Sequence, residues 1–156
     1  MRWRYDDPPL VWLFVAAYAV HLLEEFFGGF PGWLALVAGR PLPVRDFLII
    51  NAIGFGAMSA AARLSTTRES LGWLAIAIAT VAAVNGLLHL FGSLLTGTYS
   101  PGLITGVVLY LPLGQLALLR AWHQAPASFF QRGVAAGLAA HGVVILAALG
   151  SANLSP

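Results

Sequence analysis

The sequence predicts an all-α fold: an integral membrane bundle of about five transmembrane helices, in a single domain covering residues 1–156. Hydrophobic residues make up 59% of the chain and charged residues only 9%, whereas a soluble domain usually carries about 25% charged residues. In addition, mostly apolar stretches recur at the length that a membrane-spanning helix needs, about 20 residues. So little charge cannot cover the surface of a water-soluble globule.

The composition also excludes several classes of function. The chain has no cysteine, which rules out a disulfide scaffold and a thiolate metal site. A soluble enzyme and a disordered tail are disfavoured by the low charge. Every basic residue among the eight is an arginine, and these lie at the ends of apolar stretches rather than in one patch. We therefore expect no nucleic-acid partner.

Five spans follow in order along the chain, at residues 10–27, 46–62, 71–95, 102–119 and 133–149. The first ends at the pair Gly28-Gly29, and the fourth begins behind Pro101. Backbone polar groups in lipid must find partners within their own segment, so each span is expected to be a helix. Small residues let such helices approach closely. Close packing is expected at the glycines within the spans: Gly54, Gly56, Gly86 and Gly137.

The first span carries three ionisable residues, His21, Glu24 and Glu25. On a helix, Glu25 lies about 40° from His21 on one side and Glu24 about 60° on the other, so all three share one face. An acidic or basic side chain at mid-span costs about 2.5–3.5 kcal/mol on insertion scales. Something must neutralise these carboxylates: a cation, protons or a wet cavity.

Polar residues of the other spans are expected at the same depth. Successive spans alternate in direction, and this places the following residues at or above one level toward the outer side: Asn51, Asn85, His89, Tyr99, Thr105 and His141. Asn85 and His89 are four residues apart and therefore share a helix face.

Two imidazoles and a carboxylate form a plausible set of ligands for a divalent metal. We predict that His21, Glu25 and His89 bind zinc or iron, because sites of two histidines and one carboxylate hold catalytic Zn²⁺ or non-haem Fe²⁺. Glu24 is expected to be either a fourth ligand or the general base that acts on metal-bound water.

Four further residues are candidates for the active site. Asn51 and Asn85 fit a role in orienting a histidine or carboxylate ligand by hydrogen bonding. Tyr99 and Thr105 flank Pro101-Gly102 and are expected to lie above the site. The role of His141 stays open.

The predicted function is a metal-dependent membrane enzyme, a hydrolase or an oxidoreductase, that acts on a lipid-like or other apolar small molecule. One alternative is a metal-free isomerase or cyclase that uses the glutamate pair for acid–base chemistry. Another is a transporter or sensor subunit without enzymatic activity. Membrane lipids are the expected surroundings, and a homo-oligomer is possible.

These residues resemble a known family. The stretch His21-Leu22-Leu23-Glu24-Glu25, followed by residues 26–33, resembles the signature of the HXXEE family of small bacterial integral membrane proteins. Asn51, the pair Asn85 and His89, and residues 99–105 also match that pattern. The resemblance covers roughly residues 10–120. It implies the membrane class and singles out the His and Glu residues, but it implies no substrate, because the family is known as a domain of unknown function.

Arginine placement predicts a multi-pass protein of the cell membrane with a cytoplasmic N-terminus and an external C-terminus. Six arginines fall on one side of a five-span chain and two on the other: Arg2, Arg4, Arg63, Arg68, Arg120 and Arg132 against Arg40 and Arg45. A reporter fused after Pro156 should give an external signal, and the same reporter inserted after Arg68 a cytoplasmic one. A cytoplasmic signal after Pro156 would overturn this topology.

Overall fold

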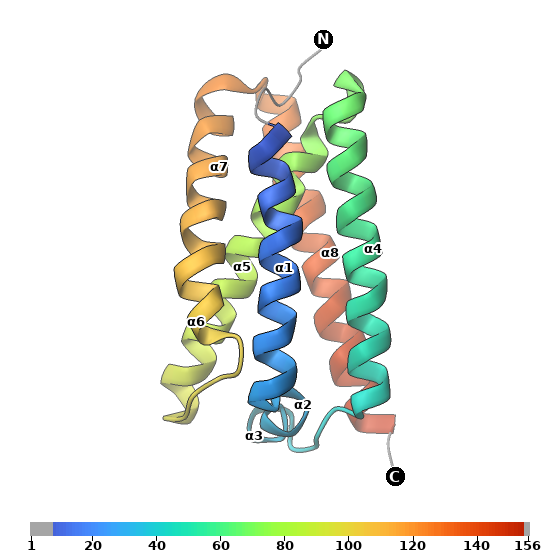
Figure 1. Ribbon diagram of the computed structural model, residues 1–156, viewed down its shortest axis with the longest axis vertical. Coiled ribbons are helices and arrows are strands. Elements are labelled where there is room, and N and C mark those ends of the chain that lie inside the picture. Colours follow the sequence, from blue (N-terminus) through green and yellow to red (C-terminus); the bar gives the residue numbers. More distant parts are fainter. Residues whose placement is uncertain (1–7, 155–156) are drawn as a thin grey trace.

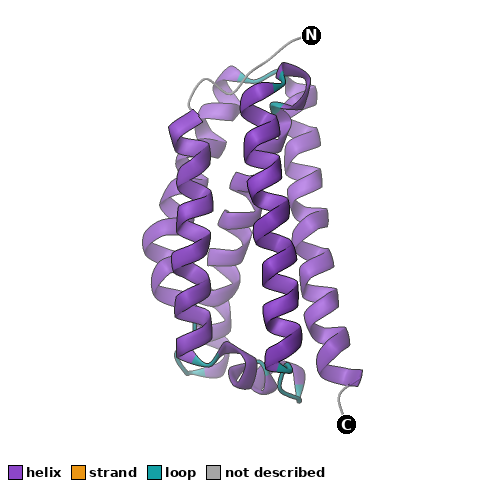
Figure 2. Ribbon diagram, turned by 45° about the vertical axis from the view of Figure 1, so that its right-hand side comes forward, coloured by secondary structure: helices purple, strands orange, loops and turns teal. Residues whose placement is uncertain are grey.

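A computed structural model describes residues 8–154, and every regular element within them is a helix. Five helices in this range are long and apolar enough to cross a membrane: Pro8–Gly28, Val44–Thr67, Glu69–Thr96, Leu103–Gln124 and Ala127–Leu154. They run side by side along the long axis of the molecule (Figures 1 and 2). The start of α1 and the end of α8 lie at opposite ends (Figure 1), as an odd number of spans requires. The predicted all-α bundle is confirmed.

Two of these five segments are composite, and short helices lie between others. The complete set in chain order is α1 (Pro8–Gly28), α2 (Phe30–Trp33), α3 (Ala35–Ala38), α4 (Val44–Thr67), η1 (Glu69–Leu71), α5 (Trp73–Thr96), α6 (Leu103–Thr105), η2 (Gly106–Tyr110), α7 (Leu111–Gln124) and α8 (Ala127–Leu154). The segment η2 is a single π-helical stretch between α6 and α7. Such stretches are frequent at functional sites.

The helices extend beyond several of the predicted spans. The predicted second span ends at residue 62, whereas α4 continues to Thr67. The hydroxyls of Ser65, Thr66 and Thr67 each donate to a backbone carbonyl of the preceding turn, which satisfies their polar groups within the helix. Likewise α8 begins at Ala127 rather than at residue 133. Apolar composition marks the part of a helix that suits hydrocarbon, not the whole helix.

Two apolar clusters occupy different ends of the bundle. The larger one joins α1 to α5 and includes Leu10, Val11, Phe14 and Ala79. The smaller one packs residues of the α1–α4 connection against α4 and consists of Leu34, Leu42 and Phe47. The polar residues of α1 follow the part of that helix that packs in the larger cluster. They therefore lie in the half of the bundle that holds the α1–α4 connection.

Close helix contacts are made at most, but not all, of the predicted glycines. A Cβ atom on Gly86 of α5 would lie 2.7 Å from the carbonyl oxygen of Gly106 in η2, so the two backbones approach as only glycine allows. A Cβ atom on Gly137 would lie 2.6 Å from Thr80. Gly56 is different, because nothing lies within 4 Å of the Cβ position there. The packing prediction is wrong for Gly56, which lies on an exposed face of α4.

Replacing Gly86 with alanine should therefore lower the free energy of unfolding by about 1–3 kcal/mol, the usual cost of overpacking. Thermal unfolding of the detergent-solubilised protein measures this change. The matched control is Gly56→Ala, which meets open space and should be neutral or stabilising, because alanine favours a helix over glycine by about 1 kcal/mol. Equal melting temperatures for the two variants would contradict the proposed contact between α5 and η2.

Candidate metal centre

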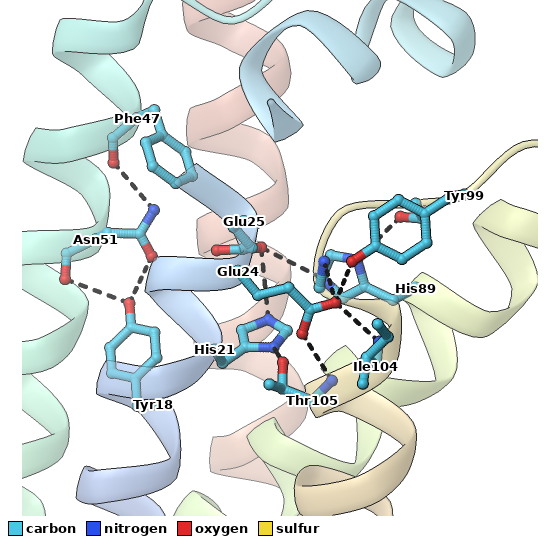
Figure 3. Close-up of polar contacts among 12 residues, drawn as sticks. Tyr18, His21, Glu24, Glu25, Phe47, Asn51, His89, Tyr99, Ile104 and Thr105 are labelled. Atoms are coloured by element: carbon cyan, nitrogen blue, oxygen red, sulfur yellow. Dashed lines mark hydrogen bonds and ion pairs between the residues drawn. The ribbon is translucent and has the colours of Figure 1, made fainter. Parts of the chain in front are cut away.

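Three buried side chains from two helices converge on one point. His21 and Glu25 lie one turn apart on α1, and His89 comes from α5; their exposed fractions are 1%, 6% and 5%. The Glu25 Oε1 atom lies 3.5 Å from Nε2 of His21 and 3.2 Å from Nε2 of His89 (Figure 3). One potential ligand atom from each residue lies within 4.8 Å of the others, so the group could hold a metal ion.

The far side of each imidazole contacts a hydroxyl group. Nδ1 of His21 lies 2.6 Å from Oγ1 of Thr105, and Nδ1 of His89 lies 3.0 Å from Oγ of Ser100. Thr105 also contacts Glu24, because its backbone N–H donates to Oε2 of that carboxylate. A hydroxyl both donates and accepts, so each of these contacts can be made by either tautomer of the imidazole. When Nδ1 of His21 carries the proton, its Nε2 presents a lone pair to the centre.

The two imidazoles are held in place by rings and by one glycine. The Tyr110 ring of η2 lies 4.5 Å from the His21 ring, and the Phe30 ring lies 5.5 Å from the His89 ring. Gly102 lies directly against both imidazoles, where a Cβ atom would fall 2.6 Å from His89 and 2.8 Å from His21. Its φ of +103° is also in the left-handed region that favours glycine. The connection between α5 and α6 can cover the centre only with glycine at this position.

Glu24 does not join this group but binds the beginning of the helix that starts at Leu103. Its Oε1 atom accepts hydrogen bonds from the backbone N–H groups of Gly102 and Ile104 at 3.2 and 2.9 Å. Oε2 accepts from the N–H of Thr105 at 2.7 Å (Figure 3). These amides have no partner inside their own helix, and a carboxylate there also interacts favourably with the helix dipole. The structure thus gives Glu24 backbone partners rather than a place beside Glu25.

Tyr99 completes the set of donors to Glu24. Its hydroxyl donates to Oε1 over 2.5 Å. Loss of hydration, this hydrogen bond and the charge of Glu24 together raise the pKa of the Tyr99 phenol from 10 to about 12. The phenol is therefore still a donor at a pH where a free tyrosine would have lost its proton. The stability that this bond contributes is fully present below pH 10 and is lost as the pH rises through about 12.

The remaining predicted residues line a cavity of about 370 Å³ beside the centre. Its wall includes Glu25 and His89 together with Asn51, Asn85 and His141. Asn51 Oδ1 accepts a hydrogen bond of 2.8 Å from the Tyr18 hydroxyl, and its Nδ2 donates to the backbone oxygen of Phe47 (Figure 3). Polar groups of α1, α4, α5 and α8 thus meet at one level, as predicted. Neither side-chain hydrogen bond of Asn51 goes to a histidine or a carboxylate.

The family described as "Protein of unknown function with HXXEE motif" matches residues 12–117. The chain belongs to the HXXEE family. No match was found among curated proteins or among solved structures.

In this HXXEE protein the two glutamates of the motif have different partners. Glu25 contacts the imidazoles of His21 and His89, and Glu24 binds the backbone at the start of α6. The motif therefore contributes two residues to the candidate metal centre, and its remaining glutamate anchors the segment that covers that centre.

Sequence reasoning missed three residues of the site: Ser100, Gly102 and Tyr110. Ser100 and Gly102 lie in the α5–α6 connection, where no helical period shows which side chains face inward. Gly102 carried one usable signal, because a glycine lets the backbone bend or approach a ligand closely. Tyr110 lies in the π-helical stretch, which shifts the positions that face the core and cannot be read from a 3.6-residue period.

Glu24→Gln should destabilise the start of the α6–α7 helix, because an amide group would face backbone N–H donors that now contact carboxylate oxygens. We expect the free energy of unfolding to fall by about 1–3 kcal/mol. Hydrogen exchange at the amides of Ile104 and Thr105 should become faster. The control is Tyr99→Phe, which removes one donor and should leave exchange at Thr105 unchanged. Unaltered exchange in Glu24→Gln would argue against the capping role.

Proposed function

We propose that this protein is a metal-dependent membrane enzyme that acts on an apolar, lipid-like substrate, with zinc or iron bound by His21, Glu25 and His89. The observation that carries the proposal is the convergence of three ligand atoms in a buried site whose imidazoles are each held from behind by a hydroxyl. Hydrogen bonding of this kind fixes the tautomer and orientation of metal-binding histidines.

Two of the three distances between the ligand atoms suit one shared ion, and the three atoms lie within 4.8 Å of one another. Ligands about 2.0–2.1 Å from a tetrahedral Zn²⁺ ion lie about 3.3 Å apart. The two separations from Glu25 Oε1 are 3.2 and 3.5 Å. Nε2 of His21 is buried and has no hydrogen-bond partner within the described residues. A ring nitrogen in that state needs a partner, and a cation between the three atoms supplies one.

The arrangement also favours the metal over metal-free chemistry by a glutamate pair. An acid–base isomerase or cyclase of that kind requires both carboxylates to face one substrate. Here the oxygens of Glu24 are bonded to backbone amides and to Tyr99, whereas Glu25 faces the histidines. We therefore propose that Glu24 is a positioning residue, which acts on His21 through Thr105, rather than a ligand or general base.

In the proposed reaction the three ligands hold the ion at the wall of the cavity. The ion would supply Lewis acidity toward a polar group of the substrate. His141, which lines the same cavity, is the imidazole left to carry a proton, and Asn85 is placed to orient the substrate. Hydrolysis suits zinc and oxidation suits iron.

Elemental analysis of the purified protein should find about one divalent ion per chain, as metal binding by a complete ligand set predicts. His21→Ala, His89→Ala and Glu25→Gln should each lose the ion. Ser100→Ala should keep the fold and bind the metal about 10–100-fold more weakly.

The control is His123→Ala, whose histidine is exposed in α7, and this variant should keep the ion. Circular dichroism verifies that each variant is helical. A wild-type protein free of divalent metal after purification without chelator, and unable to bind added Zn²⁺ or Fe²⁺, would overturn the proposal.

A further inference from the structure

We propose that the cavity beside the metal centre binds a single-chain amphiphile with an uncharged head group, such as a hydroxyl, and that the chain lies along the apolar wall between α4, α5 and α8. This inference rests on the proposed function, since it names the class of its substrate.

The size and lining of the cavity fit one apolar chain. Its volume of about 370 Å³ is at the lower end of the range for small-molecule pockets, about 300–1,000 Å³. The wall is mainly aliphatic and aromatic, with Ile50 from α4, Leu88 from α5, and Val144 and Ala148 from α8. Two-chain lipids would need more room than this.

The mouth of the cavity opens on an apolar surface. Several side chains in its wall are also exposed on the outside of the bundle, such as Phe91 at 53%, Val144 at 40% and Val37 at 59%. These residues belong to α5, to α8 and to the α1–α4 connection. In a chain whose helices span a membrane, this surface faces hydrocarbon, so a chain can enter sideways from the lipid.

The polar groups in the wall select the head group. They include the amides of Asn51 and Asn85, the phenols of Tyr18 and Tyr110, the Ser100 hydroxyl and the imidazoles of His89 and His141, with Glu25 as the charged group. Among residues 8–154 no arginine lines the cavity, although arginine is the side chain best suited to bind carboxylate or phosphate. An amide both donates and accepts hydrogen bonds, as a hydroxyl does. Asn85 lies one turn before His89 on α5 and is therefore the residue best placed to bind a hydroxyl beside the metal centre.

The test uses Trp33, which also lines the cavity, as the reporter of binding. Fluorescence is recorded while 12-bromododecanol, 1-bromododecane or 12-bromododecanoate is added to the protein in detergent, with a chelator present. Bromododecanol should quench a saturable part of the emission that is absent in Trp33→Phe, and unbrominated dodecanol should reverse it. Because the chelator removes any metal, this result does not depend on the metal content.

Two adjacent alanines provide a matched pair. Ala148 lines the cavity and Ala147 is exposed. Ala148→Phe should weaken binding of bromododecanol at least about tenfold, as expected when a side chain occupies the ligand volume, and Ala147→Phe should leave it unchanged. Asn85→Leu should weaken the alcohol about fivefold relative to the alkane, the effect of one lost hydrogen bond.

Three results would overturn the inference: the same binding in Ala148→Phe and Ala147→Phe, no difference between alcohol and alkane in their response to Asn85→Leu, or tighter binding of the carboxylate than of the alcohol. If Ala148→Phe does not fold, reversal of quenching by dodecanol in the wild type still decides whether a site exists. Saturable binding in this test, combined with elemental analysis that finds no metal in protein purified without chelator, would support the cavity and refute the metal centre. Bound metal without saturable quenching by bromododecanol would support the metal centre and refute the proposed ligand of the cavity.

Discussion

The arrangement of the bundle depends on a buried carboxylate that contacts two imidazoles. Glu25 lies within an apolar segment, where an ionised side chain without partners costs several kcal/mol. Its oxygen contacts His21 on its own helix and His89 on α5. Because the two imidazoles come from different helices, these contacts fix the rotation of α1 against α5. A bundle held only by apolar side chains in lipid would have no comparable constraint, since lipid and core are equally apolar.

Glu24, the neighbour of Glu25 on α1, contacts a different element of the bundle. Successive residues on a helix differ by about 100° in direction, so Glu24 and Glu25 face different elements. Glu25 faces α5, and Glu24 faces the amides that begin the helix at Leu103. Both carboxylates are therefore compensated, one by imidazoles and the other by backbone donors and Tyr99. The sequence argument that something must neutralise the pair is correct in principle, but it assumed a single partner for both.

The sequence predicted the site correctly where the residues lie on regular helices. Long apolar stretches predicted the five helices. The spacing of His21, Glu25 and His89 and their depth in the spans predicted that they meet, because the position of a residue along a regular helix determines the direction of its side chain. The same reasoning placed Asn85 and His141 on the cavity. It could not assign Glu24, because its partners apart from Tyr99 are backbone amides, which carry no signature in the residue types. Nor could it find Ser100, because the conformation of a connection is set by the elements it joins.

The segment that covers the centre links the fold to the proposed chemistry. Glu24 fixes the start of α6, Thr105 of that helix contacts His21, and Ser100 before it contacts His89. Gly102 then fits against both rings because it has no side chain. A displacement of the α6 start would therefore move both hydroxyls and change the direction of both ring nitrogens at once. Since a metal ion requires its ligands within a few tenths of an ångström, the contact between Glu24 and the backbone is as necessary to the proposed centre as the ligands themselves.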